Sequence, residues 1–151
     1  MSREIRVARN SGWSAGSGYC LPRSWRPVGA ASDDGFPIFD VVLVGMGADG
    51  HVLSACPGSA LCDSTAWVAA VPVPEHIEPH VARISLNPRI LELARLPIVV
   101  AHGAGKAEVL ATVLGPERDP RRWPAQVARR EGAAWFLDRA AAAGLPPALQ
   151  G

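Results

Sequence analysis

The sequence has few cysteines, and they lack the spacing that would pair them. Cys20, Cys56 and Cys62 make an odd number and contain no Cys-x-x-Cys pair. A disulfide framework and a zinc knuckle are therefore not expected. A reducing compartment is the default for such a chain, and this favours the cytoplasm.

Long apolar runs are also missing. Residues 1–20 contain no apolar segment of the kind found in a signal peptide. No stretch approaches the roughly 18 consecutive apolar residues of a membrane-spanning helix. We therefore expect neither a signal peptide nor a transmembrane segment, and no membrane partner.

An excess of charge of either sign is absent as well. The chain has 15 Lys and Arg against 14 Asp and Glu, a formal net charge of +1. This balance excludes a polybasic nucleic-acid binder and an acidic solvating tail. The one local basic cluster, at Arg118, Arg121 and Arg122, is diluted by Asp119, which favours a solvated loop over a nucleic-acid site.

What the chain does have is enough apolar material for one folded domain. Its 151 residues are 48% hydrophobic and 19% charged. Residues 1–35 differ from the rest, because their Arg, Trp, Gly and Ser residues follow no strand or helix period. We expect 1–35 to be an irregular arm, or a stretch foreign to the original fold after a frameshift or a misplaced start. Residues 36–146 would form the domain and 147–151 a tail.

Apolar runs alternate with helical segments through the second part of the chain. Strands are predicted at 40–44, 66–71, 83–86, 96–101 and 133–137, and helices at 87–94, 106–114 and 138–144. Asp138 is predicted as the N-cap of the last of these helices. This order predicts an α/β fold with a mostly parallel sheet flanked by helices, a Rossmann-like three-layer arrangement. The run from Phe39 to Val44 is continuously apolar after Asp40, which predicts a strand buried on both faces.

The richest motif follows that run directly and reads Gly45-Met-Gly-Ala-Asp-Gly-His51. Ligands of parallel sheets bind beyond the carboxyl ends of the strands, so a site is expected here. The glycines would let backbone N–H groups face an anion, and Asp49 and His51 could converge on one small molecule. The spacing also fits a dinucleotide fingerprint, but Pro57 leaves no long helix to receive a pyrophosphate.

Two other features suggest chemistry less strongly. His76 and His80 lie four residues apart, but Pro74 and Pro79 argue against a helix that would align them, and no third ligand is evident, so no metal site is expected. Cys56 could be a nucleophile, yet the sequence dictates no adjacent base or cation to activate it.

Four segments together resemble one family. Phe39 to His51, with Ser54 and Pro57-Gly-Ser59 after it, resembles the signature of the 6-phosphogluconolactonases, which share a superfamily with the glucosamine-6-phosphate isomerases/deaminases. Three further segments are similar to the family's later motifs, and they are Arg83-Ile-Ser-Leu, Gly103-Ala-Gly-Lys-Ala and Trp135-Phe-Leu-Asp. The resemblance covers about residues 36–143, in order.

The resemblance implies hydrolysis of 6-phospho-D-glucono-1,5-lactone to 6-phosphogluconate, in the pentose phosphate pathway, without a metal or cofactor. His51 would be the general base that activates water, since an imidazole has a pKa near working pH. Asp49 would orient His51 or hydrogen-bond the sugar.

The substrate-binding residues implied by the resemblance surround this pair. Arg83 and Lys106 would bind the 6-phosphate. Ser54 would line the pocket, together with the loop glycines Gly45, Gly47 and Gly50. Backbone N–H groups between Gly45 and Gly47 would stabilise the developing oxyanion. Arg83 and Lys106 would then face the same cleft as His51.

The chain also departs from the family pattern. The isomerases/deaminases carry a Glu five residues after the motif His, where this chain has Cys56, which disfavours deaminase chemistry. The lactonases have an N-terminal Gly-Gly-Ser/Thr-Pro-like phosphate loop that we do not find here. The sheet is therefore expected to be incomplete on its N-terminal side, with an exposed edge. A homodimer through that edge, a marginally stable chain, a fragment and a non-catalytic degenerate relative are the alternatives.

Overall fold

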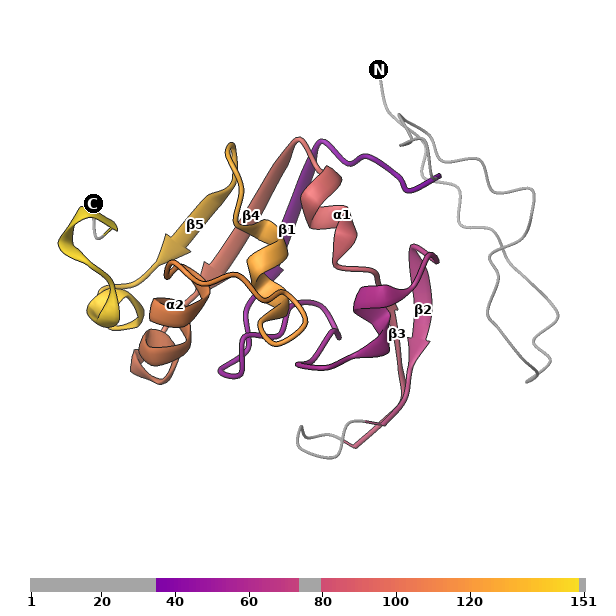
Figure 1. Ribbon diagram of the computed structural model, residues 1–151, viewed down its shortest axis with the longest axis horizontal. Helices are drawn as coiled ribbons and strands as arrows, with labels where there is room; N and C mark the ends of the chain where they lie inside the picture. Colours follow the sequence, from indigo (N-terminus) through magenta and orange to yellow (C-terminus); the bar gives the residue numbers. More distant parts are fainter. Residues whose placement is uncertain (1–34, 74–79, 150–151) are drawn as a thin grey trace, which may run out of the picture.

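The computed structural model describes residues 35–73 and 80–149 of the chain (Figure 1). The predicted arm 1–35 therefore lies almost wholly outside the described residues, as does His76. Within the described ranges, no helix is long and apolar enough to cross a membrane.

The main sheet has three parallel strands in the order β1-β4-β5 (Figure 1). They are β1 (Val41–Gly45), β4 (Leu96–Ala101) and β5 (Ala134–Leu137). Leu43 lies level with Ile98, and Val100 lies level with Phe136. The prediction of a parallel α/β sheet is confirmed, and each of these strands lies within a residue of its predicted bounds.

The remaining two strands form a separate antiparallel pair. β2 (Val68–Val71) pairs with β3 (Arg83–Leu86), and Ala70 lies opposite Ile84. The predicted sheet was mostly parallel, and β2 and β3 are the strands to which the parallel βαβ pattern does not extend. Parallel neighbours need a crossover of about a dozen or more residues, usually a helix, whereas this connection is short and proline-rich.

The helices are short, and most of them are single 3-10 turns. Among the described residues, the α-helices are α1 (Arg89–Leu93) and α2 (Ala107–Val113). The 3-10 helices are η1 (Ala60–Asp63), η2 (Ala104–Lys106), η3 (Pro124–Ala128), η4 (Ala141–Gly144) and η5 (Pro147–Leu149). The predicted helix 138–144 is thus only η4, and η3 lies in a segment where no helix was predicted.

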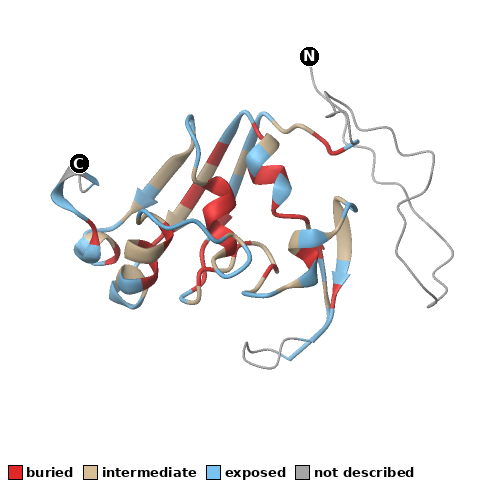
Figure 2. Ribbon diagram, in the orientation of Figure 1, coloured by how far each residue is buried: buried red, intermediate tan, exposed pale blue. Residues whose placement is uncertain are grey.

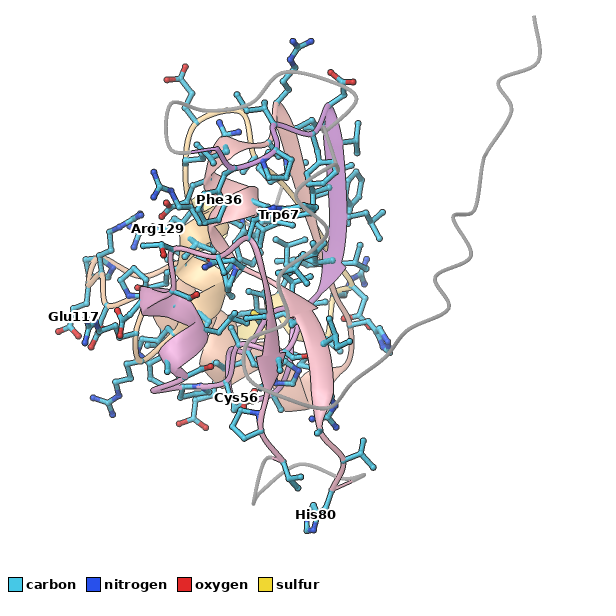
Figure 3. All side chains as sticks on the ribbon, turned by 90° about the vertical axis from the view of Figure 1, so that its right-hand side faces the viewer. Phe36, Cys56, Trp67, His80, Glu117 and Arg129 are labelled. Carbon is cyan, nitrogen blue, oxygen red and sulfur yellow. The ribbon has the colours of Figure 1, made fainter. Side chains whose placement is uncertain are left out.

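The hydrophobic core lies between one face of the main sheet and these helices. Val44, Val99 and Ala101 point from the strands into the core, where they join Leu110 and Val113 of α2. Figure 2 shows buried residues concentrated on α1, η3 and the central strand. In the turned view of Figure 3, the helices lie on one side of the main sheet.

The expectation that β1 is buried on both faces is wrong. It is an edge strand, and the side chains of Leu43 and Val41 are 67% and 55% exposed. Successive side chains of a strand point to opposite faces, and the described helices cover only the face that carries Val44. A continuous apolar run shows that both faces are apolar, but it does not show that both are covered.

Candidate active site

The Gly45–His51 loop lies at the carboxyl end of β1, as the sequence predicted. The N–H of Met46 donates to the carbonyl oxygen of Val100 at 3.3 Å, which continues the strand pairing for one residue. The chain then folds back on itself, because the N–H of Gly47 donates to the carbonyl oxygen of His51 at 2.9 Å. Gly50 has a φ of +80°, a conformation that favours glycine. The loop is therefore closed by its own hydrogen bonds.

Asp49 and His51 form a close pair within this loop. The Nδ1 atom of His51 lies 2.6 Å from Oδ1 of Asp49, and the same oxygen accepts the backbone N–H of His51 at 3.1 Å. An ionised carboxylate only accepts hydrogen bonds, so it favours the tautomer with the proton on Nδ1. Nε2 is then the basic nitrogen, and the half-buried ring presents it away from Asp49.

The pKa of Asp49 reflects this pairing. Burial raises the pKa of the carboxyl group, but hydrogen bonds from the backbone and ring of His51 and the attraction of its charge outweigh burial. The net result is a pKa below the ordinary value. Asp49 therefore stays ionised at neutral pH and can hold the imidazole in place.

Gly47 is required for a different reason from the one predicted. A Cβ atom added at Gly47 would overlap the His51 ring and lie 2.5 Å from Oδ1 of Asp49. Its N–H, like that of Met46, already donates within the chain, so neither is available for an oxyanion. The predicted oxyanion role of these two N–H groups is wrong. Gly47 instead makes room for the Asp49–His51 pair.

His51 shares an open pocket of about 560 Å³ with Lys106, as predicted. The pocket is lined by Leu43, Val44, Gly45, Met46, Gly47, His51, Leu53 and Lys106. Lys106, at the start of α2, donates from Nζ to the carbonyl oxygen of Met46 at 2.7 Å. An ammonium group has three N–H bonds, so this contact leaves donors for an anion in the pocket.

Ser54 and Cys56 line a neighbouring pocket, which includes Ser59 and Ala69 and not His51. The backbone N–H of Ser54 donates to Oγ of the buried Ser85 at 3.1 Å, which ties this segment to β3. The substrate-binding role of Ser54 stays a prediction. The structure places it beside the His51 pocket rather than in its lining.

Arg83 is not among the residues that line the His51 pocket or the pocket beside it. Its charge nevertheless acts on this region, because it lowers the pKa of the Cys56 thiol. Burial and the nearby Asp49 carboxylate raise that pKa more strongly, so the net shift is upward. A protonated thiol is a poor nucleophile, and this disfavours nucleophilic catalysis by Cys56.

Two supporting contacts had no signal in the sequence. The indole of Trp123 lies 3.1 Å from where a Cβ atom of Gly50 would be, and the N–H of Ala125 donates to the carbonyl oxygen of Gly50 at 2.9 Å. The Asp138 carboxylate accepts the N–H of Gly103 at 3.0 Å and that of Ala141 at 2.8 Å. Asp138 was predicted only as a helix cap, but it also holds the turn that leads to Lys106.

Metal ligands do not gather in the described part of the chain. Residues 35–73 and 80–149 contain no group of three or more His, Cys, Asp or Glu side chains that could hold an ion. His80 is exposed at the start of the segment that leads into β3.

Comparison with known proteins gives the same assignment as the motifs. The model of the family described as glucosamine-6-phosphate isomerases/6-phosphogluconolactonase matches residues 23–136. The chain belongs to this family. The match includes β1, the Asp49–His51 loop and Lys106, so the site described here lies within the family's shared region.

Individual relatives agree with the family match. The chain is 38% identical over 114 residues to the 6-phosphogluconolactonase of Rattus norvegicus, covering 75% of this chain and 44% of the relative. It is 40% identical over 119 residues to the 6-phosphogluconolactonase of Mycobacterium tuberculosis, covering 78% and 47%. The solved 6-phosphogluconolactonase of Trypanosoma brucei superposes with a TM-score of 0.64 at 34% identity, covering 74% and 44%. The chain thus spans somewhat less than half the length of these relatives.

Proposed function

We propose that the chain hydrolyses 6-phospho-D-glucono-1,5-lactone to 6-phosphogluconate. The observation that carries this proposal is the Asp49–His51 pair in one pocket with Lys106, within a family that includes 6-phosphogluconolactonases. A base (His51) and a cation (Lys106) that line the same pocket suit a substrate with an electrophilic carbonyl and a phosphate. The relatives named as lactonases support the choice of substrate.

His51 acts as the general base in the proposed reaction. Its Nε2 removes a proton from water as the water oxygen bonds to the lactone carbonyl carbon, and the carbonyl oxygen becomes an oxyanion. The intermediate then collapses, the bond to the ring oxygen breaks, and the protonated His51 returns the proton to that oxygen. Asp49 keeps Nδ1–H oriented and stabilises the imidazolium between these two steps.

The remaining predicted residues bind the substrate. Lys106 offers its ammonium group to the 6-phosphate across the pocket from the reacting carbonyl. Gly45 and Gly47 shape the pocket lining, and Gly50 turns the loop so that Asp49 and His51 meet. Arg83 and Ser54 would contact the part of the substrate that extends beyond the His51 pocket.

The test compares lactone hydrolysis by wild-type chain, by His51→Ala and by buffer, because the lactone also opens unaided. Acceleration by the wild type that is lost in His51→Ala supports the proposal. A wild-type rate equal to the buffer rate contradicts it and favours the second candidate, a non-catalytic relative. That candidate is favoured by the placement of Ser54 outside the His51 pocket.

We also propose that the isolated chain forms a homodimer through the free edge of β1. The edge strand carries apolar side chains at Val41 and Leu43, and antiparallel pairing of two β1 strands would satisfy its backbone groups. Sedimentation of the purified chain tests this, and a monomer at every concentration contradicts it. The cytoplasm is the proposed compartment, consistent with the free thiols of Cys56 and Cys62.

A further inference from the structure

Leu53 has a backbone conformation that its own side chain disfavours. Its φ angle is +57°, and among the described residues it is the one residue other than glycine with a positive φ. In this left-handed region the Cβ atom of an L-residue crowds the following carbonyl oxygen, which raises the free energy of the folded state. Glycine avoids this crowding and asparagine tolerates it, so strain at a leucine indicates that the surrounding structure imposes the conformation.

The conformation is imposed by a tight turn in which Leu53 is the first central residue. The N–H of Ala55 donates to the carbonyl oxygen of Val52 at 3.0 Å, and both residues are fully buried. Turns with a positive φ at the first central residue are dominated by glycine, asparagine and aspartate. The second central residue, Ser54, donates its N–H to Oγ of the buried Ser85 at 3.1 Å. The turn is therefore held to the core at its two ends and to β3 at its centre.

The turn places the side chain of Leu53 in the wall of the candidate site. Successive side chains of an extended segment point to opposite sides. Val52 is 0% exposed and belongs to the core, whereas His51 before it and Leu53 after it both line the open pocket. Leu53 is half-buried and packs against the core cluster. Its isobutyl group therefore lies between the core and the pocket.

The lining of this pocket divides into basic and apolar groups. His51 and Lys106 carry the basic groups, and the other side chains of the lining are apolar. Leu53 follows His51 by two residues, so the Cα atoms of the two residues lie no more than about 7 Å apart. An isobutyl group this close to the proposed general base occupies space beside the reacting carbonyl of a bound substrate.

Packing of the core alone does not explain a leucine at this position. The side chain is only half-buried, and glycine or asparagine would relieve the backbone strain. A wall of fixed shape beside the base does explain it, because the strained turn keeps the isobutyl group in one place. Such a wall can reject a substrate by size, and one added group in a closely fitting apolar site changes binding by about tenfold or more.

We propose that Leu53 is a specificity-determining residue that limits the size of the substituent on the carbon next to the reacting carbonyl. This inference rests on the proposed use of the pocket for a six-carbon sugar phosphate, and it specifies which of these compounds the pocket accepts. With carbon 1 at His51, the substituent on carbon 2 is the first to meet the side chain of Leu53. A hydroxyl group fits there, and an N-acetyl group does not.

Two variants separate the wall from the strain. Leu53→Gly and Leu53→Ala both remove the isobutyl group, but only glycine relieves the positive φ. Leu93→Ala is the matched control, because Leu93 is also half-buried against the core but does not line the pocket. Isothermal titration calorimetry measures the binding of glucose 6-phosphate and of N-acetylglucosamine 6-phosphate, which differ in the group on carbon 2. Neither probe is a lactone, so the measurement does not depend on hydrolysis.

The proposal predicts a change in selectivity together with an unusual order of stability. The wild type and Leu93→Ala should bind glucose 6-phosphate at least about tenfold more tightly than N-acetylglucosamine 6-phosphate, and both Leu53 variants should lower this ratio to about threefold or less. In denaturant titration, Leu53→Gly should unfold at a higher midpoint than Leu53→Ala. This order is the reverse of the usual one for these two residues, because alanine keeps the strain.

Several outcomes would overturn the proposal. An unchanged binding ratio in both Leu53 variants, or the same loss of selectivity in Leu93→Ala, would remove the role in specificity. A higher midpoint for Leu53→Ala than for Leu53→Gly would remove the strain that holds the wall. Failure of the wild type to bind either probe would also overturn it. A wild type that discriminates between the probes but does not accelerate lactone opening would contradict only the proposed hydrolysis.

Discussion

The two faces of the main sheet have nearly the same composition and opposite surroundings. Val44 and Val99 on one face are buried under α2, whereas Leu43 and Phe136 on the other are exposed. The strands alone do not distinguish these faces, because each carries Val and other apolar residues. The difference comes from the direction in which the chain crosses the sheet. Apolar character alone therefore does not show that a face is covered, and topology decides which face the described helices cover.

The largest expected effect comes from placing a charged side chain on each face of the main sheet in turn. Val99→Asp would bury a carboxylate in the core and should lower the free energy of unfolding by about 4 kcal/mol or more, enough to unfold the chain. Val41→Asp, on the exposed face that carries Leu43 and Phe136, should change it by less than about 0.5 kcal/mol. Denaturant titration measures both free energies, and equal losses would show that this face is covered in solution.

The second-largest effect concerns the Gly45–His51 loop at the carboxyl end of β1. Gly47→Ala would place a methyl group against the His51 ring and displace the Asp49–His51 pair, so lactone hydrolysis should fall about 100-fold. The matched control is Gly105→Ala, because a Cβ atom at Gly105 meets nothing within 4 Å and Gly105 does not line the His51 pocket. Initial rates of the two variants test this, and similar rates would show that the loop relaxes without loss of the pair.

A smaller effect is expected on the covered side of the pocket, where α2 begins. Lys106→Ala should raise KM by about tenfold and change kcat less, because a phosphate contact made equally before and in the transition state contributes uniform binding. Steady-state kinetics separate the two constants. A loss confined to kcat would instead place the Lys106 ammonium beside the reacting carbonyl.

The smallest effect is a pH dependence of stability that comes from Asp49. The pKa of Asp49 in the folded chain lies below its ordinary value of 3.8, so between these two pKa values the unfolded chain binds the proton more readily than the folded chain. The contribution of Asp49 to stability is therefore present above about pH 4 and is lost as the pH falls through the folded pKa. Unfolding free energies of wild type and Asp49→Asn between pH 6 and 3 should converge at the acid end. A constant difference would contradict the pairing with His51.

Much of the candidate site could be predicted from the sequence, because it is local. Gly47, Asp49 and His51 lie within five residues, and a loop that follows a parallel strand lies at the carboxyl edge of the sheet. Lys106 was also placed correctly, since the loops after β1 and β4 open on the same edge of the sheet. The donor role of the Gly47 N–H was not predictable, because it depends on where the chain turns back to meet the carbonyl of His51.

The support behind the loop was not accessible from the sequence. Trp123 and Ala125 reach Gly50 from η3, more than seventy residues along the chain, and no motif marks them. Asp138 was visible as a cap, but its bond to Gly103 depends on β4 and β5 being neighbours. Such contacts follow from packing between segments, for which local propensity carries no information.

The sequence by itself determined the parallel strands, the Asp49–His51 loop at the end of β1 and the family to which the chain belongs. These features depend on short-range pattern, namely apolar runs, glycines and residues a few positions apart. Only the tertiary structure decided that β2 and β3 form a sheet of their own, that the N–H of Gly47 donates to the carbonyl of His51, and that one apolar face of the main sheet is exposed. Each of these outcomes depends on which segments become neighbours, and that is settled by the handedness of the crossovers and the packing of the whole chain.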